Sequence, residues 1–135
     1  MIELTAAMRA FLQERRFAVL ATLRKDGSPL LTVMWFLLDG DEIVFNSKRG
    51  RRKDDNLTRD PRVSLIVEDE YRFVRVEGRV RAIADPAVAQ ADIGRLAVRY
   101  EGTESAERRM REVFSRQERI SYRLPVRRVY AGGFD

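Results

Sequence analysis

Residues 43–61, IVFNSKRGRRKDDNLTRDP, decide the fold of this 135-residue chain. The stretch starts as an alternating apolar strand with Ile43 and Phe45, and the strand ends at Asn46 and Ser47. The next six positions hold five basic residues: Lys48, Arg49, Arg51, Arg52 and Lys53. A short helical stretch follows, and a proline stops it. The pattern predicts a strand, a basic turn and a short helix in direct succession.

The chemistry of this turn suits an anion. Gly50 allows the backbone to bend sharply between the cations. Arginine and lysine make charge-assisted hydrogen bonds to phosphate oxygens, and Asn46 and Ser47 add amide and hydroxyl donors. We therefore interpret the turn as a candidate phosphate site. A solvated basic turn is the alternative, because runs of charge are commonly just hydrated surface.

Size and charge narrow the class of protein. A chain of 135 residues is expected to form one domain, residues 1–135, and a ligand cavity inside such a monomer would consume much of its core. A dimer with its site between subunits is therefore favoured. Lysine and arginine number 26 against 21 acidic residues, a net charge of +5, which fits anionic small ligands and permits nucleic acid without requiring it.

Two absences in the composition exclude much of enzyme chemistry. The chain has no cysteine, hence no disulfide, thiolate nucleophile or cysteine zinc site, and no histidine, hence no Ser-His-Asp triad and no histidine-bound haem or metal. We expect no metal site and assign no catalytic residue. The protein is predicted to be either a binder or an enzyme whose cofactor carries the chemistry.

No apolar run reaches the length of a signal peptide or a membrane span, so we expect a cytoplasmic protein that does not bind membranes.

Outward from the basic turn, the chain reads as short strands joined by tight turns. The expected strands are 17–23, 30–38, 42–47, 62–68, 71–83 and 120–130, the last interrupted at Pro125. The expected helices are 4–12, 51–59, 86–100 and 106–114. We expect strand 30–38 to be buried on both faces and strand 71–83 to bulge at Gly78. Consecutive strands with helices added late predict a mainly β fold, an antiparallel barrel with packed helices.

These residues also carry a resemblance. The runs FAVLATLRKDGSPLLTVMWFLLDGDEIVFNS (17–47), RGRRKDDNLTRDPRVSL (49–65) and VRVEGRVRAI (74–83) resemble the split-barrel flavin-binding proteins of the pyridoxamine 5′-phosphate oxidase-like superfamily. Within it, the chain is most similar to small oxidoreductases that use the deazaflavin coenzyme F-420. The resemblance implies a split β-barrel of six to seven antiparallel strands and a homodimer with two cofactor sites at the subunit interface.

The resemblance also implies site residues. The expected phosphate and ribityl contacts are Asn46, Ser47, Arg51, Arg52, Lys53 and Asn56. The strand along the flavin ring would contribute Thr32, Val33, Met34 and Trp35, and the partner subunit would cover the ring with Tyr71 and Phe73. Each assignment has an alternative. Val33 and Trp35 could belong to the core, and Asn56 could lie on a helix surface. Tyr71 and Phe73 could simply fill a dimer interface.

The resemblance implies an F-420-dependent reductase that transfers hydride to an unsaturated small molecule. The alternatives are an FMN oxidase or reductase, a non-catalytic cofactor binder, and a nucleic-acid-binding domain. The nucleic-acid alternative is disfavoured because the basic turn lacks interleaved aromatic residues and no groove-reading helix motif is present. Residues 122–125, YRLP, stand where vitamin B6 oxidases carry a motif with arginine and histidine, which disfavours that activity. The substrate stays open among quinones, tetrapyrroles and other unsaturated compounds.

Overall fold

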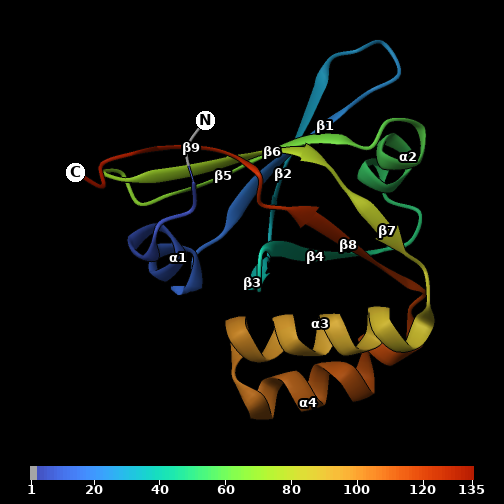
Figure 1. Ribbon diagram of the computed structural model, residues 1–135. Coiled ribbons are helices and arrows are strands. Elements are labelled where there is room, and N and C mark those ends of the chain that lie inside the picture. The colour runs from blue at the N-terminus through green and yellow to red at the C-terminus, as the bar shows by residue number, and fades with distance from the viewer. Residues whose placement is uncertain (1–2) are drawn as a thin grey trace.

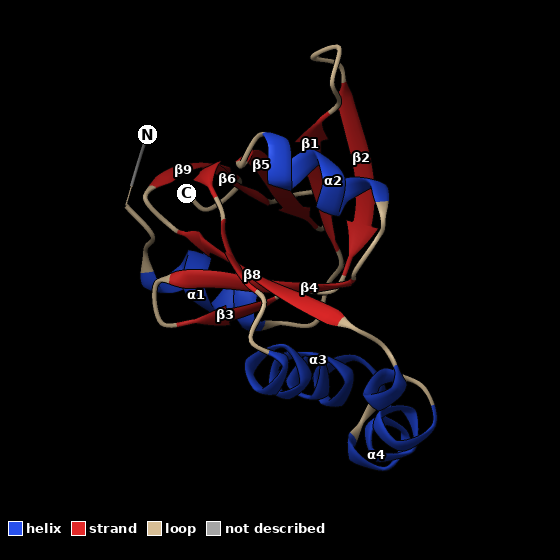
Figure 2. Ribbon diagram, turned by 90° about the vertical axis from the view of Figure 1, so that its right-hand side faces the viewer, coloured by secondary structure: helices blue, strands red, loops and turns tan. Residues whose placement is uncertain are grey.

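Two antiparallel sheets form the body of the protein in a computed structural model that describes residues 3–135. One sheet has the strand order β2-β1-β5-β6-β9 and the other β3-β4-β8-β7. The first sheet comprises β1 (Ala18–Leu23), β2 (Pro29–Met34), β5 (Arg62–Glu68), β6 (Phe73–Arg79) and β9 (Arg128–Gly132). The second comprises β3 (Leu37–Asp39), β4 (Glu42–Lys48), β7 (Arg81–Ile83) and β8 (Arg119–Pro125). Figure 2 shows the sheets curving around a common interior, which confirms the predicted split barrel.

Helices cover the barrel from three sides (Figure 1). They are α1 (Ala6–Gln13), α2 (Arg52–Arg59), α3 (Pro86–Glu101) and α4 (Thr103–Glu112), with a 3-10 turn η1 (Phe114–Arg116). Thr5 caps α1, as its hydroxyl accepts a hydrogen bond from the Met8 amide at 3.2 Å. Helices α3 and α4 form a hairpin, and α3 packs against β4 and β8. No helix in residues 3–135 is long and apolar enough to cross a bilayer; the cytoplasmic location stays a prediction.

The barrel interior is filled by the inward side chains of the strands. Buried and partly buried residues alternate along β1 and β5, as expected for strands with one face on a core. Phe11 and Leu12 of α1 are fully buried and close the interior together with Phe45 and Tyr122, whose rings stack at 4.9 Å. This apolar core fixes β4 and β8 side by side, and the candidate site is built on these two strands.

The single strand expected over residues 30–38 is wrong. The chain leaves the first sheet after Met34 and joins the second sheet at Leu37. The Tyr100 hydroxyl donates to the Phe36 carbonyl and accepts from the Phe36 amide, both at 3.1 Å, so it replaces the missing strand partners. Burial on both faces is also wrong, because β2 is an edge strand whose residues Leu31 and Val33 are 65% and 67% exposed.

The strand expected over residues 71–83 is also divided. Register between β5 and β6 continues through the pair Val63–Gly78, so the expected bulge at Gly78 is absent. The break falls at Val80, whose amide donates to the Pro61 carbonyl at 3.0 Å while the chain crosses to the second sheet. Gly78 instead permits close packing, since a Cβ there would meet Leu124 Cδ1 at 3.3 Å. These two divisions, together with the expected interruption at Pro125 that separates β8 from β9, turn the six expected segments into nine strands over residues 3–135.

Candidate functional site

The basic turn is anchored at both ends rather than free in solvent. Strand β4 pairs with β8 along its whole length, up to the pair Lys48–Arg119. Beyond it, the Arg49 amide donates to the Glu118 carbonyl at 2.8 Å, and Gly50 takes a left-handed φ of 100°. The turn then enters α2 at Arg51, which is the N-cap residue. The expected succession of strand, basic turn and helix is confirmed.

A buried carboxylate holds the turn against the barrel. Asp54 accepts hydrogen bonds from the Ser47 hydroxyl at 3.0 Å, the Arg51 amide at 3.1 Å and the Tyr122 hydroxyl at 2.7 Å. Burial raises the pKa of Tyr122, and its hydrogen bond to Asp54 raises that pKa further. Tyr122 is therefore a neutral donor near neutral pH. Ser47, which was expected to touch a ligand, lies in this internal network and is fully buried.

A cavity of about 220 Å³ opens beside the turn and brings together residues from both ends of the chain. Seven of the expected site residues line it: Thr32, Val33, Met34, Trp35, Asn46, Arg51 and Lys53. The helical hairpin and β8 complete the wall with Ile93, Leu96, Arg109, Phe114 and Arg119. The hydroxyl of Thr32 is buried and has no hydrogen-bond partner within residues 3–135, which leaves one polar group of the wall available to a ligand.

Four cations converge on this cavity: Arg51, Lys53, Arg109 and Arg119. Lys53 and Arg119 are only 4% and 8% exposed. Burial, and after it the charge of Arg51, lowers the pKa of Lys53 and lowers that of Arg119 to about 10. Among residues 3–135, no carboxylate lies within 4.0 Å of the charged groups of Arg51, Lys53 or Arg119. The charge of Asp54 raises both pKa values but only partly offsets the burial. Buried like charges without a direct ion pair are costly, and a bound anion would lower that cost.

Arg119 is held rigidly in the wall. Its Nε donates to Asn46 Oδ1 at 2.8 Å and its Nη1 to Gln117 Oε1 at 2.6 Å. Asn46 in turn donates to the Ala89 carbonyl at 2.9 Å and to the Ser121 hydroxyl at 2.8 Å. Asn46 therefore orients Arg119, and its own amide is already engaged on both sides.

Phe114 lies between two arginines of the wall, Arg109 of α4 and Arg119 of β8. The guanidinium carbons of Arg109 and Arg119 lie 4.9 and 5.0 Å from the centroid of its ring. Arg109 also pairs with Glu101 at 3.4 Å. Sequence reasoning missed both arginines, because Arg109 and Arg119 sit in a charge-rich run, residues 107–119, that reads like an exposed helix face. Phe114 between them was the available signal.

The remaining expected site residues lie outside the cavity. Arg52 is exposed on the first turn of α2, and Asn56 is buried, with its amide donating to Thr22 Oγ1 at 3.1 Å. Tyr71 is 85% exposed in the turn before β6, and Phe73 packs beside Gly132 of β9. The last two were expected to act across a subunit interface, so their role stays a prediction.

Comparison with known proteins identifies relatives of this arrangement. The family model described as pyridoxamine 5′-phosphate oxidase matches residues 4–122. A biliverdin reductase of Mycobacterium tuberculosis that depends on reduced F-420 is 35% identical over 94 residues, which are 67% of this chain and 68% of the relative. Among solved structures, a conserved hypothetical protein of Mycobacterium tuberculosis is 29% identical with a TM-score of 0.82, covering 98% of this chain and 86% of its own. An F-420 reductase is 26% identical with a TM-score of 0.72, covering 90% and 94%.

Proposed function

The chain belongs to the pyridoxamine 5′-phosphate oxidase family, and on that premise we propose that it is a reductase that uses coenzyme F-420. The observation that carries the proposal is the convergence of Arg51, Lys53, Arg109 and Arg119 on one cavity beside β2. The similar biliverdin reductase and F-420 reductase support the choice of coenzyme.

The residues of the cavity fit an anionic coenzyme. Two arginines and a lysine without carboxylate partners match phosphate and carboxylate groups in charge and in donor geometry. The unpaired Thr32 hydroxyl adds a donor on β2, where the coenzyme ring is expected. When bound, reduced F-420 supplies a hydride.

The chain's own part in the reaction is binding, orientation and exclusion of water. Arg51 and Lys53 hold the anionic end from the turn, while Arg119, fixed by Asn46, holds it from β8. Trp35 and the apolar residues Ile93 and Leu96 line the cavity between these cations and keep water from the ring. Such positioning brings the reacting atoms to about 3–3.5 Å from each other and can lower the barrier by up to about 7–11 kcal/mol.

A homodimer is part of this proposal. Leu31 and Val33 make an exposed apolar pair on edge strand β2, next to the cavity wall. Tyr71 is also exposed, at 85%. Large apolar groups exposed on a sheet edge favour association. In the proposed dimer the partner subunit's Tyr71 covers the coenzyme ring.

FMN is the second candidate coenzyme. The four cations also suit a phosphate monoester, which carries up to two negative charges. An FMN-bound protein would be yellow when purified from an ordinary expression host and could pass electrons to oxygen.

A parallel titration of the purified protein with F-420, FMN and FAD tests the proposal. Trp35 is the only tryptophan of the chain and lines the cavity, so its fluorescence reports occupancy. We expect F-420 to bind with a dissociation constant in the micromolar range or tighter, and FMN and FAD to bind more weakly. Tighter binding of FMN would move the assignment to the second candidate, and failure of all three would overturn the proposal.

A further inference from the structure

A second cavity, of about 490 Å³, is also lined by Trp35. It is lined by the segment after α1, with Arg15, Arg16 and Phe17, and by the end of α3, with Tyr100 and Glu101. Trp35 is the one residue that belongs to the described wall of both cavities. Two ligands, one in each cavity, would therefore be neighbours along the same indole.

The wall of this second cavity is built for a flat ligand. Tyr100 lies between two rings, with Trp35 at 5.1 Å and an interplanar angle of 5°, and Phe17 at 5.6 Å and 16°. Tyr100 is fixed by its hydroxyl, which accepts a hydrogen bond from the Phe36 amide and whose single proton lies within hydrogen-bond distance of the carbonyls of Arg16 and Phe36. Phe17, the end ring of this stack, is 59% exposed. A rigid stack that ends in an exposed ring favours a further planar π-system.

Arg15 gives the cavity an uncompensated positive charge. Arg16 is paired with Glu14 at 2.6 Å and lies 3.7 Å from Asp69, and Glu101 pairs with Arg109 at 3.4 Å. Arg15 donates from Nη1 to the Tyr100 carbonyl at 3.0 Å, and no carboxylate of residues 3–135 lies within 4.0 Å of it. Its remaining N–H groups are free to bind a carboxylate.

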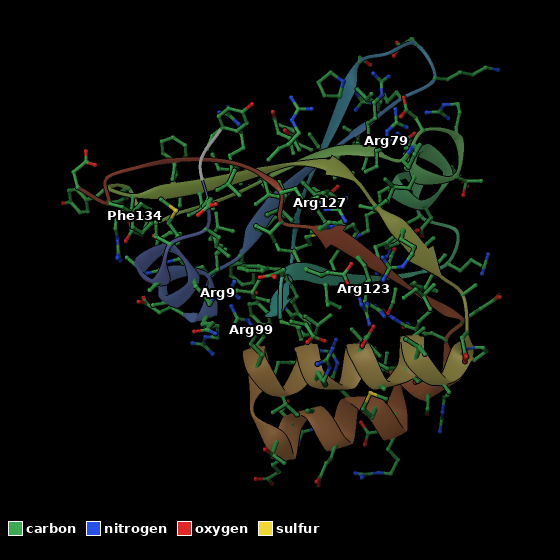
Figure 3. The ribbon with its side chains drawn as sticks, in the orientation of Figure 1. Arg9, Arg79, Arg99, Arg123, Arg127 and Phe134 are labelled. Carbon is green, nitrogen blue, oxygen red and sulfur yellow. The ribbon has the colours of Figure 1, made fainter. Side chains whose placement is uncertain are left out.

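Arg99 keeps this arrangement in place. Its guanidinium donates to the carbonyls of Leu12, Gln13 and Glu14 at 3.1, 2.9 and 2.9 Å, so it joins α3 to the end of α1 (Figure 3). The segment that carries Arg15 and Phe17 is thus tied to the helix that carries Tyr100. The cavity wall is preformed rather than assembled by a ligand.

We propose that this second cavity binds the substrate, and that the substrate is a planar conjugated molecule with a carboxylate group. Its ring system stacks on Phe17 and its carboxylate binds Arg15. The assignment as a substrate site rests on the proposed function, because only then is the neighbouring cavity occupied by a hydride donor. The binding of planar acids itself does not depend on the coenzyme.

The first test uses 2-naphthoate and 2-naphthamide, which share a ring system and differ in charge. Trp35 gives a single indole N–H signal in a proton–nitrogen correlation spectrum, since the chain has one tryptophan. In the protein without coenzyme, we expect 2-naphthoate to shift this signal and to bind about tenfold more tightly than the amide, because it gains a charge-assisted hydrogen bond. Equal affinity for acid and amide would overturn the proposal.

Two substitutions locate the binding groups. Arg15→Gln is expected to lower the affinity for 2-naphthoate about tenfold and to leave the affinity for 2-naphthamide unchanged. The matched control is Arg127→Gln, an exposed arginine that lines neither cavity. Phe17→Leu is expected to lower the affinity for 2-naphthoate and 2-naphthamide by a similar factor. If Phe17→Leu instead changes only the oligomeric state in gel filtration, Phe17 covers a subunit contact and the stacking role is wrong.

A last titration separates this proposal from the proposed function. F-420 is added to protein saturated with 2-naphthoate. Simultaneous binding of both supports adjacent sites for coenzyme and substrate. Displacement of 2-naphthoate by F-420 would assign this cavity to the coenzyme and overturn the inference while leaving the function intact. Binding of 2-naphthoate without any binding of F-420 would overturn the function and, with it, the role as a substrate site.

Discussion

The basic turn supplies two cations to the cavity wall, Arg51 and Lys53, and two later elements supply the other two, Arg109 from α4 and Arg119 from β8. Arg51 and Lys53 are close in sequence and are fixed locally, through Asp54 and the start of α2. Arg109 and Arg119 are placed by contacts between residues that are far apart in the sequence. Arg119, for example, donates to Asn46, which lies 73 positions earlier in the chain. Half of the positive charge of the site, from Arg51 and Lys53, is therefore visible as a cluster in the sequence. The other half, from Arg109 and Arg119, is brought to the site only by packing.

The largest expected effect comes from the turn. The double variant Arg51→Ala with Lys53→Ala removes two charged donors without carboxylate partners, and we expect F-420 affinity to fall by about 100-fold or more. Fluorescence titration at fixed salt measures it. The matched control, Lys25→Ala with Arg127→Ala, removes the same charge from exposed positions outside the turn and the cavity and should change affinity little. Equal losses in both variants would mean that net charge, not the turn, holds the coenzyme.

The anchoring of the turn is tested by Asp54→Ala. This change leaves the buried hydroxyls of Ser47 and Tyr122 without their acceptor, so we expect a loss of about 2–3 kcal/mol in the free energy of unfolding. Urea denaturation measures the loss. Asp55→Ala, at an exposed position of the same helix turn, should stay within about 0.5 kcal/mol of the wild type. Similar values for the two variants would show that the turn does not depend on its buried carboxylate.

The hairpin is tested by Arg109→Gln against Arg108→Gln. Arg109 lines the cavity, whereas its neighbour Arg108 is exposed. We expect Arg109→Gln to lower the affinity for F-420 about fivefold, which is less than the loss in the turn variant. The effect is smaller because Arg109 already forms an ion pair with Glu101 at 3.4 Å. The second variant should bind as the wild type does. A loss in the Arg108 variant that matches the Arg109 variant would remove the hairpin from the site.

The smallest expected effect has the opposite sign. In protein without ligand, Lys53→Met should raise the free energy of unfolding by about 0.5–1 kcal/mol at pH 7, because it removes a buried cation without a counter-ion. The folded-state pKa of Lys53 is below its usual value of 10.5. The unfolded chain therefore binds this proton more tightly, and wild-type stability rises with pH between the lowered pKa and 10.5.

The gain from Lys53→Met should accordingly shrink as pH rises through that window, where the wild-type lysine becomes neutral. Urea denaturation at pH 7 and near pH 10 measures both values, and Lys48→Met at an exposed position is the control. A gain that is independent of pH would indicate a packing effect of the methionine rather than relief of a buried charge.

Much of the architecture could be predicted from the sequence. Strand 62–68 matches β5 at both ends, and helix α2 begins one residue after the start expected from the basic turn. These elements have strong local signals, namely alternation of apolar residues and a proline stop. Each of the apolar runs 30–38 and 71–83 was expected to form one strand, but each forms two. The break is not visible in the sequence because a chain that changes sheets keeps the same apolar composition on both sides of it.

In the candidate site too, residues with a local sequence signal were predicted correctly and residues fixed by distant partners were not. Asn46, Arg51 and Lys53 were expected at the site and line the cavity. Ser47 and Asn56 had the same polar character in the sequence, but their side chains bond inward to Asp54 and Thr22. A hydrogen-bond partner at a distance of many residues decides this difference, and no local pattern records it.

The barrel class, the basic turn and the lack of histidine and cysteine chemistry follow from the order and composition of the residues alone, because short-range periodicity and composition do not depend on packing. The packing of distant segments sets which cations share a cavity, how Asn46 orients Arg119, and that Trp35 lines both a charged cavity and an aromatic one. The physical reason is that burial and electrostatic coupling depend on distances through space, and the packing of α3 and α4 on β4 and β8 sets those distances.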